Sequence, residues 1–152
     1  MYMRVVLQRV RKAQVIIEEK ESEEIGNGIL ILLGIEMADQ LEDVDWLVNK
    51  VLNLRIFNDK NGVMNCSLID KGGELMIISQ FTLMAATKKG NRPSYIRAAN
   101  HKHAIPLYNY FIKKADSILK SKVATGDFGA NMKVTLENDG PVTILIDSKN
   151  KE

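Results

Sequence analysis

Polar side chains interrupt an apolar run in the segment Ser79-Gln80-Phe81-Thr82. The segment follows Leu75–Ile78, which has the composition of a buried strand, and α/β sheets commonly bind ligands at the ends of their strands. Two hydroxyls, an amide and backbone N–H groups at such a point could stabilise a developing oxyanion. The alternative is an ordinary strand whose hydroxyls bond to neighbouring backbone, and the residues alone favour that alternative.

No set of residues spaced as a hydrolase triad accompanies this segment, and the chain lacks a Gly-x-Ser-x-Gly nucleophile elbow. His101 and His103 are the only histidines, and a spacing of two would place them on different faces of a helix. We therefore expect surface or capping roles for them. Cys66 is expected to be a small buried residue, because no basic neighbour would activate its thiol. No carboxylate cluster has metal-ligand spacing, so we expect no metal.

Gly140-Pro141 lies between two apolar stretches near the end of the chain. Proline at the start of a strand cannot donate to the ladder, so a turn followed by an edge strand is the ordinary interpretation. X-Pro peptide bonds are also the ones that can be cis, which would direct two carbonyls to one side. The sequence leaves that isomer open.

Composition and length place these residues in one globular domain. The chain has 152 residues, 45% apolar and 26% charged, which is enough for a single core over residues 1–152. One cysteine allows no intramolecular disulfide, which favours a reducing, cytoplasmic compartment. Arg9, Arg11 and Lys12 come too early for a secretion signal, and the apolar run 29–35 is too short to span a membrane.

The formal charge of +2 conceals two segments of opposite sign. Residues 18–45 carry ten acidic residues against Lys20 alone, and residues 86–122 carry nine basic residues against Asp116 alone. A basic segment of this kind can attract a polyanion, and the aromatic residues within it favour nucleic acid. A solvated helix face that serves solubility is an equally good explanation of the charge.

The apolar spacing predicts an α/β fold: a single compact domain with mixed or antiparallel sheet layers packed by two main helices. The helices are expected from Asp39, with Asp39 and Glu42 as a capping box, and over 105–119, with Pro106 near the start. Strands are expected at 4–10, 13–19, 29–33, 55–57, 75–78, 132–136 and 142–146, in the approximate order βββαβ, loop, αββ.

Together these motifs resemble the D-aminoacyl-tRNA deacylase family over nearly the whole chain. Tyr95 departs from the pattern, where phenylalanine is expected. The motifs that carry the resemblance are Val10–Ala13, Gly28–Gly34, Arg55–Phe57, Met64-Asn65 and, most specifically, Ser79–Leu83, Gly90–Ser94 and Asn138–Thr143.

The resemblance implies a cytoplasmic homodimer of that fold, which needs no cofactor and hydrolyses the ester between a D-amino acid and the 3′-terminal adenosine of tRNA. Glycine mischarged on tRNA is a further implied substrate. Gly140 and Pro141 would form a cis peptide that enters the partner's pocket and excludes L side chains. Phe128 and Met132 would line that pocket.

The resemblance also gives the segment Ser79–Thr82 a role. The N–H of Phe81, with Gln80 and the Thr82 hydroxyl nearby, would stabilise the oxyanion while the 2′-hydroxyl of the tRNA assists. A competing hypothesis makes Thr82 a covalent nucleophile. Lys88, Lys89 and Arg92 are expected to hold the acceptor end of the tRNA.

Two other functions compete with this hypothesis. The basic segment would also suit a nucleic-acid-binding protein of the same fold without catalysis. DNA-binding relatives of this fold carry a C-terminal extension, and because the sequence ends at Glu152 we expect the enzyme instead. A thioesterase or peptidase that acts on small molecules is a weaker rival, because histidine-based machinery is absent.

Overall fold

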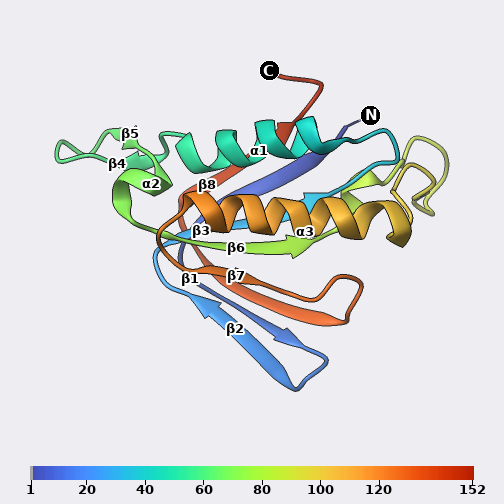
Figure 1. The fold of residues 1–152 in the computed structure, drawn as a ribbon, viewed down its shortest axis with the longest axis horizontal. Coiled ribbons are helices and arrows are strands. Elements are labelled where there is room, and N and C mark those ends of the chain that lie inside the picture. Colours follow the sequence, from blue (N-terminus) through green and yellow to red (C-terminus); the bar gives the residue numbers. More distant parts are fainter. Residues whose placement is uncertain (1) are drawn as a thin grey trace.

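The structure is a computed structural model that describes residues 2–152. A mixed sheet lies at its centre, and the long helices α1 and α3 run across one face of that sheet (Figure 1). The expected α/β domain with two main helices is therefore confirmed. The strands are β1 (Arg4–Ile17), β2 (Glu21–Ile25), β3 (Gly28–Gly34), β4 (Phe57–Asn58), β5 (Met64–Cys66), β6 (Glu74–Ser79), β7 (Val123–Thr125) and β8 (Met132–Asp147). The helices are α1 (Leu41–Asn53), α2 (Leu68–Lys71), α3 (His101–Ile118) and the 3₁₀ helix η1 (Phe81–Met84).

Strand β1 connects the two halves of the main sheet. On one side it pairs along its length with antiparallel β8, and on the other it pairs with β3 and then with β2. Strand β3 is parallel to β6, and β6 is parallel to β7, which gives the order β2-β1-β3-β6-β7. The parallel pair β3–β6 places the ends of both strands at one edge of the sheet.

The prediction of separate strands at each end of the chain is wrong. The segment 4–10 and residues 13–17 of the segment 13–19 belong to one strand, β1, and the segments 132–136 and 142–146 belong to another, β8. Register shifts around Val10 let both strands bend together without ending. Arg11 and Lys12 are exposed at this bend, and these charges interrupt the apolar pattern without interrupting the strand.

Strand β3 is buried on both faces, as its continuous apolar run predicts. Ile29, Ile31 and Leu33 pack in a core beneath α1 and α3. Leu30 packs in a second core on the opposite face, together with the second half of β1 and the first half of β8. The sheet therefore curls around this second core while the helices cover the first.

The two main helices are confirmed, but their starts differ from the prediction. The capping box of α1 is formed by Gln40 and Asp43, not by Asp39 and Glu42. The Asp39 carboxylate is instead fully buried and accepts the N–H groups of Met3 and Glu36 at 2.8 and 2.7 Å. Helix α3 begins at His101, so Pro106 lies inside the helix.

The sequence pattern does not predict several of the short elements. The polar segment that follows β1 is strand β2, and its side chains are mostly exposed, so no apolar alternation identifies it. The apolar pattern predicts neither helix α2 nor the three-residue strand β7. Strand β6 ends at Ser79, so the segment that follows it is η1 and not a continuation of the strand.

Candidate active site

The end of β6 leads directly into the segment with the most promising polar groups. The N–H of Gln80 donates to the carbonyl of Leu33 at 2.8 Å, which ties the segment to the end of β3. Gln80 then caps η1, and its carbonyl accepts the N–H of Leu83 at 3.2 Å. A Cβ on the neighbouring Gly34 would lie 2.8 Å from Met84 and 2.9 Å from Leu83, so glycine allows η1 to pack closely on β3. These contacts fix the backbone of Gln80 and Phe81.

A pocket of about 640 Å³ lies beside this strand end. We call it the strand-end pocket. Three of the four predicted catalytic residues, Ser79, Gln80 and Phe81, line it, as do two of the four residues predicted for substrate binding and chiral selection, Phe128 and Met132. Its other lining residues are Ile78, Tyr95, Ala98, Ala99, Asn100, His101, Gly129, Ala130, Asn131 and Val134. Segments that are distant in the sequence therefore meet here.

Thr82 lies next to the pocket wall and is connected to it through Gln80. The side-chain amide of Gln80 donates to the Thr82 hydroxyl, so the two side chains hold each other in place. The first N–H groups of a helix have no partner within that helix. Because η1 begins at Phe81, the N–H groups of Phe81 and Thr82 are in that position beside the pocket. N–H groups in this position can stabilise an oxyanion by donating hydrogen bonds to it.

Phe128, Met132 and His101 form another part of the pocket lining. The ring of Phe128 contacts Tyr108 edge-on at 5.6 Å, and the buried Tyr108 hydroxyl donates to the carbonyl of Ile77 at 3.2 Å. Burial, with Asp127 nearby, raises the pKa of Tyr108 far above its usual value, so the hydroxyl stays protonated. A Cβ on Gly126 would lie 2.3 Å from the sulfur of Met132, so that glycine makes room for the methionine.

His101 was not expected in the site, yet it lines the strand-end pocket. It is the first residue of α3 and contacts the ring of Phe128 edge-on at 5.4 Å. His103, in contrast, contacts the Asp39 carbonyl through Nε2 at 3.0 Å and lies outside the lining. Asn100 caps α3, because its side chain accepts the N–H of His103 at 3.0 Å. A cap at Asn100 marks His101 as the first residue of the helix, so Asn100 is the sequence signal that could have located His101. Among the lining residues only Tyr95 and His101 are ionisable.

Gly140 and Pro141 do not line the strand-end pocket of their own chain. Both are exposed in the bend of β8, and the peptide between them is cis. Asn138 braces the bend, since its side chain accepts the N–H of Val142 at 2.8 Å and donates to the Val142 carbonyl at 3.1 Å. The pair is thus presented outward from the surface of the chain.

Lys88, Lys89 and Arg92 are exposed in the loop that follows η1. Two backbone hydrogen bonds between Ala86 and Ser94, at 2.8 and 3.0 Å, close this loop. Tyr95 follows it and packs edge-on against Phe81 at 5.0 Å, which connects the base of the loop to the pocket rim. The three cations are therefore close in sequence to residues that line the strand-end pocket, but they do not line it themselves.

Within residues 2–152, no three side chains of histidine, cysteine, aspartate or glutamate come together as metal ligands would. Cys66, expected to be buried, is partly exposed. No helix in the same range has the length and apolar character required to cross a membrane.

The chain is similar to proteins of known name. A family model described as D-Tyr-tRNA(Tyr) deacylase matches residues 6–147. Proteins named D-aminoacyl-tRNA deacylase from Phocaeicola vulgatus and Bacteroides thetaiotaomicron are 59% and 57% identical to it over 150 residues, which span 99% of this chain and 100% of each relative.

Two solved structures have a similar fold. The "c-Myc DNA Unwinding Element Binding Protein" superposes with a TM-score of 0.89 at 38% identity, over 95% of this chain and 98% of that one. A "probable eukaryotic D-amino acid tRNA deacylase" superposes with a TM-score of 0.82 at 18% identity, over 97% of this chain and all of the other, and this match bears on the fold alone.

Proposed function

The chain belongs to the D-Tyr-tRNA(Tyr) deacylase family, and on that basis we propose that it hydrolyses the ester bond of D-aminoacyl-tRNA to free amino acid and tRNA. One structural observation carries the proposal. Residues from the end of β6 and from the start of β8 meet in the strand-end pocket, where unpaired N–H groups adjoin an aromatic wall. The substrate would place such an enzyme in the cytoplasm, where tRNA is used.

In the proposed reaction, water attacks the ester carbonyl carbon and the bond to the 3′ oxygen of the terminal adenosine breaks. The carbonyl oxygen carries the developing negative charge, which the N–H of Phe81 stabilises, with the Gln80 amide held in place by Thr82. The proton lost by water passes to the departing 3′ oxygen through the neighbouring 2′-hydroxyl. An aminoacyl ester is already activated, so positioning and oxyanion stabilisation suffice.

The proposal assigns chiral selection to Gly140 and Pro141 of a second copy of the chain. In one chain these residues lie outside the strand-end pocket and are exposed, which supports a role in a neighbouring subunit's site. Inserted there, they would bind the amino group of the substrate and leave no space for an L side chain. Glycine has no side chain to exclude, so glycyl-tRNA would also be cleaved. Light scattering should then give twice the chain mass of 17.1 kDa.

A second candidate is a nucleic-acid-binding protein of this fold without catalysis. It is favoured by the 38% identity to the DNA unwinding element binding protein and by the exposed cations Lys88, Lys89 and Arg92. The two functions differ in one measurable result.

Incubation of purified protein with D-tyrosyl-tRNA distinguishes them. Release of free D-tyrosine at catalytic protein concentrations supports the deacylase. Salt-sensitive binding of intact D-tyrosyl-tRNA, with no release above the rate in buffer, supports the binding protein and contradicts the deacylase.

A further inference from the structure

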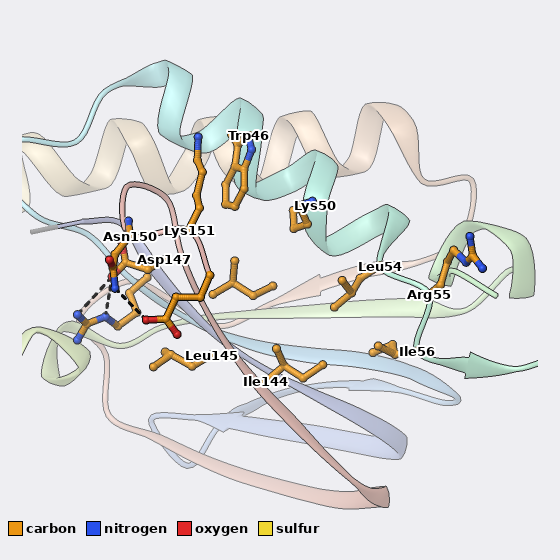
Figure 2. A pocket seen from close by; sticks show the side chains of 13 residues that line it. Trp46, Lys50, Leu54, Arg55, Ile56, Ile144, Leu145, Asp147, Asn150 and Lys151 are labelled. Atoms are coloured by element: carbon orange, nitrogen blue, oxygen red, sulfur yellow. Dashed lines mark hydrogen bonds and ion pairs between the residues drawn. The ribbon is translucent and has the colours of Figure 1, made fainter. Parts of the chain in front are cut away.

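A second pocket, of about 450 Å³, lies between α1 and the end of β8 (Figure 2). We call it the Trp46 pocket. It shares no lining residue with the strand-end pocket, and nothing in the proposed reaction uses it. Its lining residues are Arg4, Trp46, Lys50, Leu54, Arg55, Ile56, Ile144, Leu145, Ile146, Asp147, Asn150, Lys151 and Glu152.

The flat ring of Trp46, the only tryptophan of the chain, forms part of the wall. Two ammonium groups lie over this ring: Nζ of Lys151 is 4.6 Å from the ring centroid, and Nζ of Lys50 is 5.4 Å from it. Figure 2 shows Lys151 beside Trp46, with Leu145 and Ile144 below them. An aromatic surface and two cations therefore face the same space.

Most of the positive charge in this pocket is not neutralised. Arg4 is paired with Asp147 at 3.3 Å and donates to the Leu83 carbonyl at 3.0 Å. Within the described chain, Lys50, Arg55 and Lys151 have no carboxylate within 4.0 Å. Arg55 donates to the side-chain oxygen of Asn65, and Glu152 is the one acidic side chain of the lining besides Asp147. Lys50 and Lys151 therefore have no ion-pair partner among the described residues.

The floor of the pocket is apolar. Leu54, Ile56, Ile144 and Leu145 contribute to it, and Leu145 is 62% exposed, the highest value of any leucine among the exposed large hydrophobic residues of the described chain. An apolar ligand surface that covers this floor would be stabilised by the hydrophobic effect. The pocket volume falls in the range of small-molecule sites.

The C-terminal segment that precedes Lys151 is bonded to the rest of the chain. Nζ of Lys149 donates to the carbonyl of Ala38 at 3.2 Å and lies 3.6 Å from the Asp43 carboxylate. The N–H of Ser148 donates to the carbonyl of Met3 at 2.9 Å. These contacts fix Ser148 and Lys149 beside the N-terminal end of α1, two residues before Lys151.

We propose that the Trp46 pocket binds a nucleotide, recognised as a flat base joined to a phosphate. When the nucleotide binds, the ammonium groups of Lys50 and Lys151 move off the Trp46 ring and donate charge-assisted hydrogen bonds to the phosphate. The base then stacks on the ring face that they leave, above the apolar floor. A small anion without a ring would leave the ring and the floor uncovered, whereas an uncharged aromatic compound would leave the cations unpaired. The nucleotide is either free or part of a single-stranded RNA segment.

Tryptophan fluorescence tests this proposal directly, because Trp46 is the only tryptophan. Titration of the full chain with AMP should change the fluorescence with a saturable curve, and adenosine or inorganic phosphate alone should bind at least tenfold more weakly. Lys50→Gln and Lys151→Gln should each weaken AMP binding by about tenfold. Lys113→Gln, an exposed lysine of α3 outside the pocket, should leave it unchanged.

A short single-stranded oligoribonucleotide identifies the source of the nucleotide. Figure 2 shows Arg55 at the opposite end of the pocket from Lys151. If RNA is the ligand, the oligonucleotide binds more tightly than AMP and Arg55→Gln weakens it selectively; if a free nucleotide is the ligand, AMP binds at least as tightly.

Three results would overturn the proposal: no saturable change with millimolar AMP, equal binding of AMP and adenosine, or unchanged AMP binding in both lysine variants. None of these readouts depends on ester hydrolysis, so they are independent of the proposed deacylase activity.

Discussion

Single residues of the strand-end pocket offer little acid–base chemistry. Tyr95 and His101 are the only ionisable side chains of its lining, no carboxylate lines it, and no hydrogen bond joins Ser79 to His101 among the described residues. The polar groups that remain are hydroxyls, amides and backbone N–H groups. Such a site suits a substrate that brings its own activated ester and its own hydroxyl, as aminoacyl-tRNA does.

Thr82→Ala tests whether Thr82 positions Gln80 or attacks the substrate. If Thr82 only positions the Gln80 amide, single-turnover hydrolysis of D-tyrosyl-tRNA should slow by about tenfold, corresponding to the loss of a hydrogen bond worth about 1.4 kcal/mol. Thr82→Ser, which keeps the hydroxyl, should stay near the parent rate. Near-complete loss in Thr82→Ala, with an acyl-enzyme trapped on the parent protein, would show that Thr82 is the nucleophile.

Pro141→Ala tests the proposed exclusion of L side chains. Steric rejection of this kind is worth about 10- to 200-fold in rate, so the ratio of D- to L-tyrosyl-tRNA hydrolysis should fall by about tenfold or more. Glu137→Gln is a suitable control, because Glu137 is also exposed on β8. Full discrimination in Pro141→Ala would show that Pro141 is dispensable for chiral selection.

Several residues singled out from the sequence line the strand-end pocket, but His101 also lines it and was not among them. Ser79, Gln80, Phe81, Phe128 and Met132 line one pocket. His101 was missed because its place depends on where α3 begins, and the apolar stripe alone does not mark that start.

At the scale of elements, close packing of η1 against the end of β3 shapes the site. Gly34→Ala would force a methyl group to within 2.8 Å of Met84 and 2.9 Å of Leu83, so η1 must move. We expect a loss of about 1 to 3 kcal/mol in the free energy of unfolding, measured by urea denaturation, and slower deacylation.

Gly26→Ala is the matched control for this substitution. A Cβ at Gly26 would have no neighbour closer than the Glu74 carboxylate at 3.4 Å, so stability should change little. Equal stability and equal activity of Gly34→Ala and the parent protein would contradict this account of η1.

The buried Asp39 contacts Met3 just before β1, Glu36 in the segment before α1, and Lys149 of the C-terminal segment. Burial raises the pKa of its carboxyl from 3.8 to about 6, and the nearby Asp43 also raises this pKa. The N–H groups of Glu36 and Met3 and the charge of Lys149 favour the anion and so lower the pKa. The folded protein therefore binds this proton more tightly than the unfolded chain does. The contribution of this group to stability is greatest below pH 4 and is lost as the pH rises through about 6.

Asp39→Asn supplies the reference for this pH dependence. Between pH 7.5 and pH 5, the free energy of unfolding of the parent protein should increase by about 1 to 2 kcal/mol relative to that of Asp39→Asn. Carboxyls whose pKa is lowered, such as those of Asp59 and Asp70, titrate in both proteins and cancel in the difference. A difference in unfolding energy that is constant with pH would contradict the assignment.

Elements with a strong apolar pattern were predictable, and those shaped by tertiary contacts were not. β3 and α1 follow from their runs and stripes of apolar residues. The continuity of β1 and β8 through their shared bend was not visible, because the bend depends on pairing between residues more than 120 positions apart. Local propensity carries no information about such pairing.

For the whole molecule, the basic loop that contains Lys88, Lys89 and Arg92 is the proposed binding surface for the acceptor end of tRNA. Charge reversal at all three should weaken tRNA binding and reduce the slope of log affinity against log salt by about one for each phosphate that the loop no longer binds. Lys20→Glu and Lys60→Glu, exposed elsewhere, serve as controls. Unchanged affinity and slope in the triple variant would refute this role of the loop.

We propose that the molecule is a hydrolase selective for D-aminoacyl-tRNA. The most direct test compares the hydrolysis rates of D-tyrosyl-, L-tyrosyl- and glycyl-tRNA, prepared on the same tRNA, at limiting concentrations of the purified protein. We predict rapid hydrolysis of the D-tyrosyl ester, measurable hydrolysis of the glycyl ester, and release of L-tyrosine no faster than in buffer. Hydrolysis of the L-tyrosyl ester as fast as that of the D-tyrosyl ester would contradict the claim.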